Sequence, residues 1–392
     1  MKPIPYGRQC LDEDDIQAVA EVLRGDWLTT GPFVEEFEKK VANYCGARFG
    51  VAFNSGTSAL HGAVLAAGIA PGDEVITTPL SFVATSNCVE YVGSRPIFVD
   101  IDPQTYCIDC GRVAEAITSA TKAIIPVDYA GYPLSMRDIK AITAERNILL
   151  IEDAAHALGA SDGATRIGRR ADMTMLSFHP VKHVTTGEGG IILTDREDLN
   201  ERLRLYRSHG IVRKPDQMTE NHGPWYYEMH HLGLNYRITD IQCALGTSQM
   251  DKLEKFLVRR NEIAAYYDKS FANIFWLKTP PRPENGRHAY HLYPVLVLLP
   301  GEDDFSPYSD FDRLMELRAR FFSYLRDNGI LAQVHYLPIH LQPYYRSKYG
   351  YKPGDYPVAE SFYAREVSLP MFPGLSDSEV EYVVDAVKRF LY

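Results

Sequence analysis

The strongest constraint on the fold is a regular alternation of short apolar runs and helix-like segments between residues 49 and 194. The runs expected to form strands cover residues 49–53, 74–78, 96–100, 123–127, 148–151, 173–178 and 191–194. Helices are expected between them, over residues 57–67, 81–92, 111–117 and 135–146. This pattern predicts an α/β fold with a mostly parallel sheet and helices on both faces. Ligands of such sheets bind at the carboxyl ends of the strands.

The length of the chain predicts two domains, because 392 residues exceed what one hydrophobic core usually supports. A helical region from 238 to about 271, read as one helix or two, contains the boundary. We therefore expect a large domain over 1–255 and a smaller α/β domain over 256–392. The small domain is predicted from strands at 290–298 and 331–335, a helix at 311–328 and a last helix from Ser376. The N-terminal segment 1–12 is expected to pack with it.

Charge and composition exclude several classes of partner. The net charge of −10, without a long basic run, argues against nucleic acid binding. No apolar run approaches the roughly 20 residues of a membrane helix, and the N-terminus lacks a signal segment. We therefore expect no membrane association and a cytoplasmic location. Cys107 and Cys110 form a lone C-x-x-C, which we interpret as reduced thiols, and no metal site is predicted.

A single lysine, Lys182, lies between two predicted strands and is followed by a Gly-Glu-Gly-Gly turn at 187–190. Burial lowers the pKa of an amine and makes it a nucleophile toward carbonyl groups. We therefore expect Lys182 to hold pyridoxal 5′-phosphate (PLP) as a Schiff base.

PLP needs further groups from the protein, and each has a candidate near a strand end. Asp153 is the candidate anion for the pyridine nitrogen, with a helix cap as the alternative. Gly56 and Thr57 open a helix and suit a phosphate, although ordinary capping residues look similar. Ser177 adds a hydroxyl. Phe82 is the candidate ring partner, with a core position as the alternative.

Taken together, the motifs identify a family. N-S-G-T, S-F-V-A-T, E-D-A-A-H, S-F-H-P-V-K with G-E-G-G, R-S-H-G and G-L-N-Y-R-I-T-D occur in this order. This set resembles the DegT-type nucleotide-sugar aminotransferases, which are PLP enzymes of the aspartate aminotransferase fold (fold type I). The resemblance runs from Tyr6 to the C-terminal helix. It implies a large PLP-binding domain and a smaller C-terminal α/β domain.

A narrower resemblance rests on residues 127–131, where many relatives carry a histidine at the position of Asp128. The segments around Tyr6, Thr30 and 332–339 are also similar to one subgroup. That subgroup aminates a UDP-linked 4-keto-6-deoxy-N-acetyl-altrosamine sugar in pseudaminic acid biosynthesis.

The resemblance implies roles for individual residues. The expected cofactor-binding residues are Gly56, Thr57, Phe82, Asp153, His156 near the ring hydroxyl, Ser177, Lys182 and, toward the neighbouring subunit's phosphate, Asn235. A homodimer with shared active sites follows from Asn235. The expected substrate-binding residues are Tyr6, Thr30, Arg237, His335 and Tyr336. A surface ion pair for Arg237 and a core position for Tyr336 remain alternatives. His179 and His183 contact substrate or satisfy loop carbonyls, and for His183 we favour the latter.

The implied reaction is a ping-pong transfer from an amino acid, expected to be L-glutamate, to the keto-sugar. Lys182 is the catalytic proton carrier, and the product is UDP-4-amino-4,6-dideoxy-N-acetyl-beta-L-altrosamine. Relatives with histidine in place of this lysine are dehydratases, so Lys182 favours transamination. Alternatives are another UDP- or dTDP-keto-sugar and a non-catalytic PLP-fold regulator. A nicotinamide oxidoreductase is disfavoured, since residues 54–57 do not fit G-x-G-x-x-G.

Overall fold

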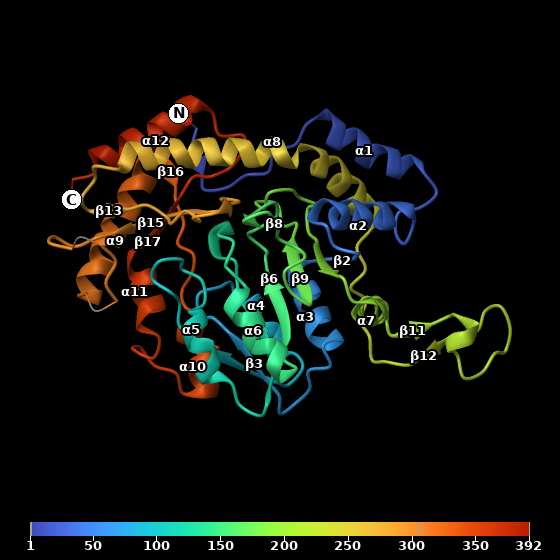
Figure 1. Cartoon of the computed structure of the whole chain (residues 1–392). Helices are drawn as coiled ribbons and strands as arrows, with labels where there is room; N and C mark the ends of the chain where they lie inside the picture. Colours follow the sequence, from blue (N-terminus) through green and yellow to red (C-terminus); the bar gives the residue numbers. More distant parts are fainter. Residues whose placement is uncertain (1, 303, 308, 392) are drawn as a thin grey trace.

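The centre of the computed structural model, which describes residues 2–302, 304–307 and 309–391, is a seven-stranded sheet (Figure 1). Its strands in spatial order are β2 (Phe49–Phe53), β10 (Gly190–Thr194), β9 (Met173–Ser177), β6 (Leu149–Asp153), β5 (Thr121–Ile125), β3 (Glu74–Thr77) and β4 (Arg95–Phe98). Only β10 runs antiparallel to its neighbours in this sheet; the other adjacent pairs are parallel. The prediction of a mostly parallel α/β sheet is confirmed.

Helices cover both faces of this sheet. The first helices of the chain are α1 (Glu13–Arg24), α2 (Pro32–Cys45), α3 (Gly56–Ala66), α4 (Ala84–Glu90), α5 (Cys110–Val113), α6 (Arg137–Arg146) and α7 (Glu197–Arg207). Val51 of β2 packs in a cluster with Leu60 of α3 and Leu203 of α7. Its neighbour Ala52 packs in another cluster with Phe37 of α2. Since adjacent strand residues point to opposite faces, the two clusters lie on opposite sides of the sheet.

The predicted helices differ from the observed ones in length. The helix expected over 81–92 is confined to α4, and the one expected over 111–117 is split into α5 and a 3₁₀ turn at Ala114–Ala116.

The long helical region is one helix, α8 (Asp240–Phe271) of 32 residues, which crosses the molecule in Figure 1. Thr239 caps it through a reciprocal pair of bonds with Gln242. Gly246 does not interrupt it. A Cβ atom at this glycine would lie 2.5 Å from the ring of Phe37, so the glycine lets α2 approach α8 closely.

A further hydrophobic cluster surrounds the C-terminal half of α8, through Ile263, Tyr267 and Phe271. It includes residues of a three-stranded antiparallel sheet, β13 (Leu277–Lys278), β15 (Tyr293–Val297) and β17 (Glu366–Leu369), and of the helices α9 (Phe311–Asp327) and α12 (Asp377–Arg389). The N-terminal β1 (Ile4–Pro5) pairs here with β16 (Ile330–Leu331), a strand shorter than the predicted 331–335. The division at 255/256 remains a prediction.

A hairpin formed by β11 (Ile211–Val212) and β12 (Glu228–Met229) projects from the body of the molecule (Figure 1). Large apolar side chains on and beside it are exposed, including Trp225 at 73% and Leu232 at 85%. The remaining strands and α-helices among the described residues are β7 (Ser161–Asp162), β8 (Thr165–Arg166), β14 (Gly286–Arg287), α10 (Pro343–Tyr349) and α11 (Pro357–Arg365). Among the described residues, no helix has the length and apolar character needed to cross a membrane.

Candidate active site

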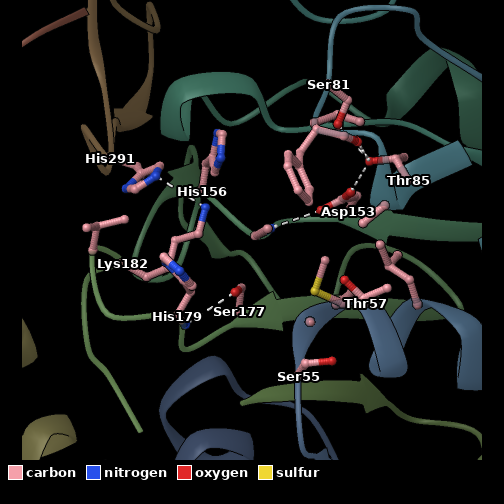
Figure 2. Close-up of a pocket in the computed structure, with 18 of the residues that line it drawn as sticks. Ser55, Thr57, Ser81, Thr85, Asp153, His156, Ser177, His179, Lys182 and His291 are labelled. Atoms are coloured by element: carbon pink, nitrogen blue, oxygen red, sulfur yellow. Dashed lines mark hydrogen bonds between the residues drawn. The ribbon is translucent and has the colours of Figure 1, made fainter. Parts of the chain in front are cut away.

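A cavity of about 410 Å³ opens at the carboxyl ends of β6 and β9, beside the N-terminus of α3 (Figure 2). Its volume suits a small organic ligand. The predicted site residues that line it are Tyr6, Gly56, Thr57, Phe82, Asp153, His156, Ser177, Lys182, His335 and Tyr336. Residues from distant parts of the sequence thus meet at the edge where ligands of parallel sheets bind.

Three predicted residues lie outside this lining. Thr30 and Asn235 are exposed, and Arg237 is half-buried. Their expected contacts with substrate or with a second subunit therefore remain predictions. His183 is buried, and its Nε2 lies 3.0 Å from the carbonyl oxygen of Ala289. The expectation that His183 satisfies a loop carbonyl is confirmed.

The amine of Lys182 lies in the cavity wall, and its Nζ is 3.2 Å from Nε2 of His291. Burial lowers the pKa of Lys182 to about 7, although the carboxylate of Asp153 acts in the opposite direction. Much of this amine is therefore unprotonated near neutral pH, as a nucleophile requires.

Asp153 ends β6 with its carboxylate in the cavity. It accepts hydrogen bonds from the Thr85 hydroxyl at 2.7 Å and from the backbone N–H of Ala155 at 3.2 Å. Burial raises the pKa of Asp153, while these two hydrogen bonds lower it. No helix begins at Asp153, so the helix-cap alternative is wrong. Two donors instead hold an anion at the position expected to face the cofactor nitrogen.

The neighbouring Glu152 points away from the cavity, as the alternation along a strand requires. Its carboxylate accepts a hydrogen bond of 3.1 Å from Nε of Arg170. Arg170 also pairs with Asp128 at 3.1 Å, and Asp128 accepts the N–H of Leu134. Asp128, the residue that pointed to a subgroup, therefore belongs to a buried ion cluster and does not line the cavity.

The N-terminus of α3 forms an anion cradle. The first N–H groups of a helix have no partner within it, and here they belong to Gly56 and Thr57. Ser55 caps the helix through Ser58. A Cβ atom on Gly56 would lie 3.2 Å from Oγ of Ser177, so the glycine brings backbone and hydroxyl close together. The cradle suits a phosphate group.

Aromatic side chains also line the cavity. Phe82 is 57% exposed, so its core alternative is wrong, and its ring centroid lies 6.0 Å from that of Tyr336. Nδ1 of His156 accepts the N–H of Ala130 at 3.2 Å. Burial lowers the pKa of His156 well below its usual value. The neutral ring therefore carries its proton on Nε2, which lies 3.3 Å from the Tyr336 hydroxyl.

Sequence reasoning gives no role to Thr85 or His291, both of which line the cavity and contact the predicted catalytic groups. Thr85 stands four residues after Ser81 in the S-F-V-A-T motif, a helical spacing that indicates hydroxyls on one face. His291 precedes β15 and lies 109 residues from Lys182, and no local pattern indicates their contact.

These residues fit PLP. The cavity combines an amine of low pKa, a buried anion, a phosphate cradle and an exposed aromatic ring. These are the groups that hold and tune this cofactor.

Comparisons with known proteins agree with this chemistry. The model of the DegT/DnrJ/EryC1/StrS aminotransferase family matches residues 9–388. The spore coat polysaccharide biosynthesis protein SpsC of Bacillus subtilis is 38% identical, over 98% of this chain and 96% of that protein. The UDP-4-amino-4,6-dideoxy-N-acetyl-beta-L-altrosamine transaminase of Campylobacter jejuni is 35% identical, over 99% of this chain and 97% of that protein.

Among solved structures, Helicobacter pylori PseC, an aminotransferase involved in the biosynthesis of pseudoaminic acid, superposes with a TM-score of 0.89. It is 32% identical, and the superposition covers 99% of both chains. The fold is therefore that of the PLP-dependent transferases. The chain belongs to the DegT/DnrJ/EryC1/StrS aminotransferase family and is a PLP-dependent sugar aminotransferase.

Proposed function

We propose that the enzyme transfers the amino group of L-glutamate to the 4-keto carbon of a UDP-linked 4-keto-6-deoxy-N-acetylhexosamine. The product would be UDP-4-amino-4,6-dideoxy-N-acetyl-beta-L-altrosamine, an intermediate of pseudaminic acid biosynthesis. The observation that carries the proposal is the full-length similarity to the C. jejuni transaminase and to H. pylori PseC. The cavity with Lys182 supports it, since the nucleophilic amine is retained.

The roles of the residues follow from the chemistry of the site. When bound, PLP supplies an aldehyde for the amino group and a ring that withdraws electrons. Lys182 would hold the cofactor and then, as a free amine, carry a proton on Nζ between the donor and the cofactor. Asp153 would keep a proton on the ring nitrogen by charge. The N–H groups of Gly56 and Thr57, with the Ser177 hydroxyl, would bind the phosphate.

We further propose a homodimer with shared active sites. The exposed apolar side chains on and beside the hairpin, including Trp225 and Leu232, suit burial against a second subunit. Asn235 and Arg237 follow this hairpin and lie outside their own chain's cavity. Mixing two inactive variants, Lys182→Ala and Asn235→Ala, should restore activity. Each mixed dimer would contain one site that has the intact Lys182 of one chain and the intact Asn235 of the other. Failure to recover activity, with subunit exchange demonstrated, would contradict a shared site.

The sugar assignment is tested with a panel of UDP- and dTDP-linked 3- and 4-keto-sugars and L-glutamate. We expect the UDP-4-keto-6-deoxy-N-acetyl-altrosamine sugar to give the highest kcat/KM, with the aminated product identified by mass spectrometry and NMR. The Lys182→Arg variant is the control for background chemistry. The similarity to SpsC favours a second candidate, another nucleotide-linked keto-sugar destined for a polysaccharide, and a preference for such a sugar would replace the first.

A further inference from the structure

The contact between Lys182 and His291 is not explained by cofactor binding alone. Nζ of Lys182 lies 3.2 Å from Nε2 of His291, and both residues line the cavity (Figure 2). His291 is only 4% exposed, and its ring centroid lies 4.4 Å from that of His156. Among the described residues, Nδ1 of His291 has no hydrogen-bond partner. The contact with the lysine is therefore the polar contact that orients this imidazole.

The backbone that carries His291 is held tightly. Tyr290 adopts a φ of 47°, in the left-handed region that non-glycine residues rarely occupy. Its ring stacks on that of His288 at 3.9 Å, and its N–H donates to Nδ1 of His288 at 2.8 Å. Such a conformation persists where the surroundings fix it, and it is often found near functional sites.

Arg260 of α8 also holds the backbone at Tyr290 and His291. This fully buried guanidinium donates to the carbonyl oxygens of Tyr290 at 2.9 Å, His291 at 3.4 Å and Met371 at 2.8 Å. The bonds to backbone carbonyls place His291 without involving its imidazole. Its side chain is thus presented to the lysine by a rigid support.

We propose that His291 is a positioning residue for Lys182, whose Nε2 accepts a hydrogen bond from the lysine amine while that amine carries a proton. This inference rests on the proposed role of Lys182 as the proton carrier. A buried carrier loses its proton too easily, and an acceptor beside it offsets the cost of burying the charge. Neutral histidine suits this task because it accepts a bond without adding a negative charge.

His291 stays neutral in this environment. Burial, and next the nearby Lys182, hold the pKa of His291 well below its usual value. The titratable and charged groups that face Lys182 are Asp153, Arg260, His156, His179, His183, His291 and His335. Among these groups, Asp153 favours the protonated amine by charge, and His291 would favour it by a hydrogen bond.

The test measures the protonation of Lys182 itself. In the full chain loaded with pyridoxamine phosphate the lysine amine is free. Trace acetylation with acetic anhydride across a pH series, read by peptide mass spectrometry against the exposed Lys122, gives the inflection of Lys182. In the wild type it should lie below the ordinary lysine value of 10.5, because burial lowers the pKa of this amine. In His291→Leu it should fall by about one unit or more, because a hydrogen bond to a charged group is lost.

Two further variants separate the hydrogen bond from general packing. His291→Gln retains an acceptor at the end of the side chain, so the inflection should return to the wild-type value. His183→Leu also removes a buried imidazole, one that bonds Ala289 instead of Lys182, and should leave the inflection unchanged. If His291→Leu does not fold, the shorter His291→Asn replaces it, with the same expected fall.

An unchanged or raised inflection in His291→Leu, or an equal fall in His291→Gln, would overturn the proposal. The readout does not involve a sugar. An error in the proposed substrate would therefore leave the acetylation profiles intact, and the two failures are distinguishable.

Discussion

Removing one hydroxyl at Thr85 tests whether the cavity tunes the charge of Asp153. The Thr85 hydroxyl donates to the buried carboxylate at 2.7 Å, and this bond lowers the pKa that burial raises. Thr85→Val keeps the shape of the side chain and removes the donor. A hydrogen bond to a charged group contributes about 1.5–3 kcal/mol, so the pKa of Asp153 should rise by about 1 to 2 units.

The assay is the pH dependence of kcat with saturating substrates. The ionised carboxylate is the form that can keep the cofactor nitrogen protonated, so activity should disappear at a higher pH on the acid side. The acid limb should move upward by about 1 to 2 pH units. Thr85→Ser retains the donor and should keep the wild-type limb. A Thr85→Val enzyme with an unshifted acid limb would refute the reasoning, because the carboxylate would not depend on this bond.

Three further variants test the lysine, the phosphate cradle and a buried acid near the cavity. Lys182→Arg should abolish turnover and the visible absorbance of lysine-bound PLP, and measurable turnover at the wild-type rate would exclude Lys182 as the carrier. Gly56→Ala should weaken PLP retention about tenfold in equilibrium dialysis, because its Cβ would lie 3.2 Å from Oγ of Ser177 and mild overpacking costs about 1–3 kcal/mol. Burial raises the pKa of Glu366 to about 8 from 4.5, so its contribution to stability is present below pH 4.5 and is lost as the pH rises through about 8. Between pH 4.5 and 8 the melting temperature of Glu366→Gln should therefore fall less than that of the wild type. The same pH dependence of the melting temperature in both proteins would contradict a raised pKa of Glu366.

The sequence was most informative where one short motif carries both a structural and a chemical signal. Ser55, Gly56 and Thr57 follow a strand and open a helix, and they lie at the cavity as expected. Asp153 and Lys182 were likewise recognisable from their positions next to strand ends. The rule that ligands bind at these ends was enough to bring the motifs together.

Contacts made across the chain were not predictable in this way. His291 reaches Lys182 directly after Tyr290, which takes a left-handed conformation that single-residue propensity disfavours. The sequence pattern at 238–271 is compatible with one helix or two, so it does not predict the continuity of α8. Gly246 weakens a helix by propensity, but α8 continues through it where Phe37 of α2 packs closely. Tertiary packing therefore determined what local pattern could not.

The single helix α8 bears on whether the two halves of the chain can be produced as separate proteins. At 1.5 Å per residue, its 32 residues extend about 48 Å. Leu253 and Leu257 pack with the residues around the central sheet, whereas Ile263 and Tyr267 pack in the C-terminal cluster. A protein truncated at residue 255 would end inside this helix and lose Leu257 from its core. The two halves are thus joined by shared secondary structure instead of a flexible linker, and neither is expected to be separable by a cut at that point.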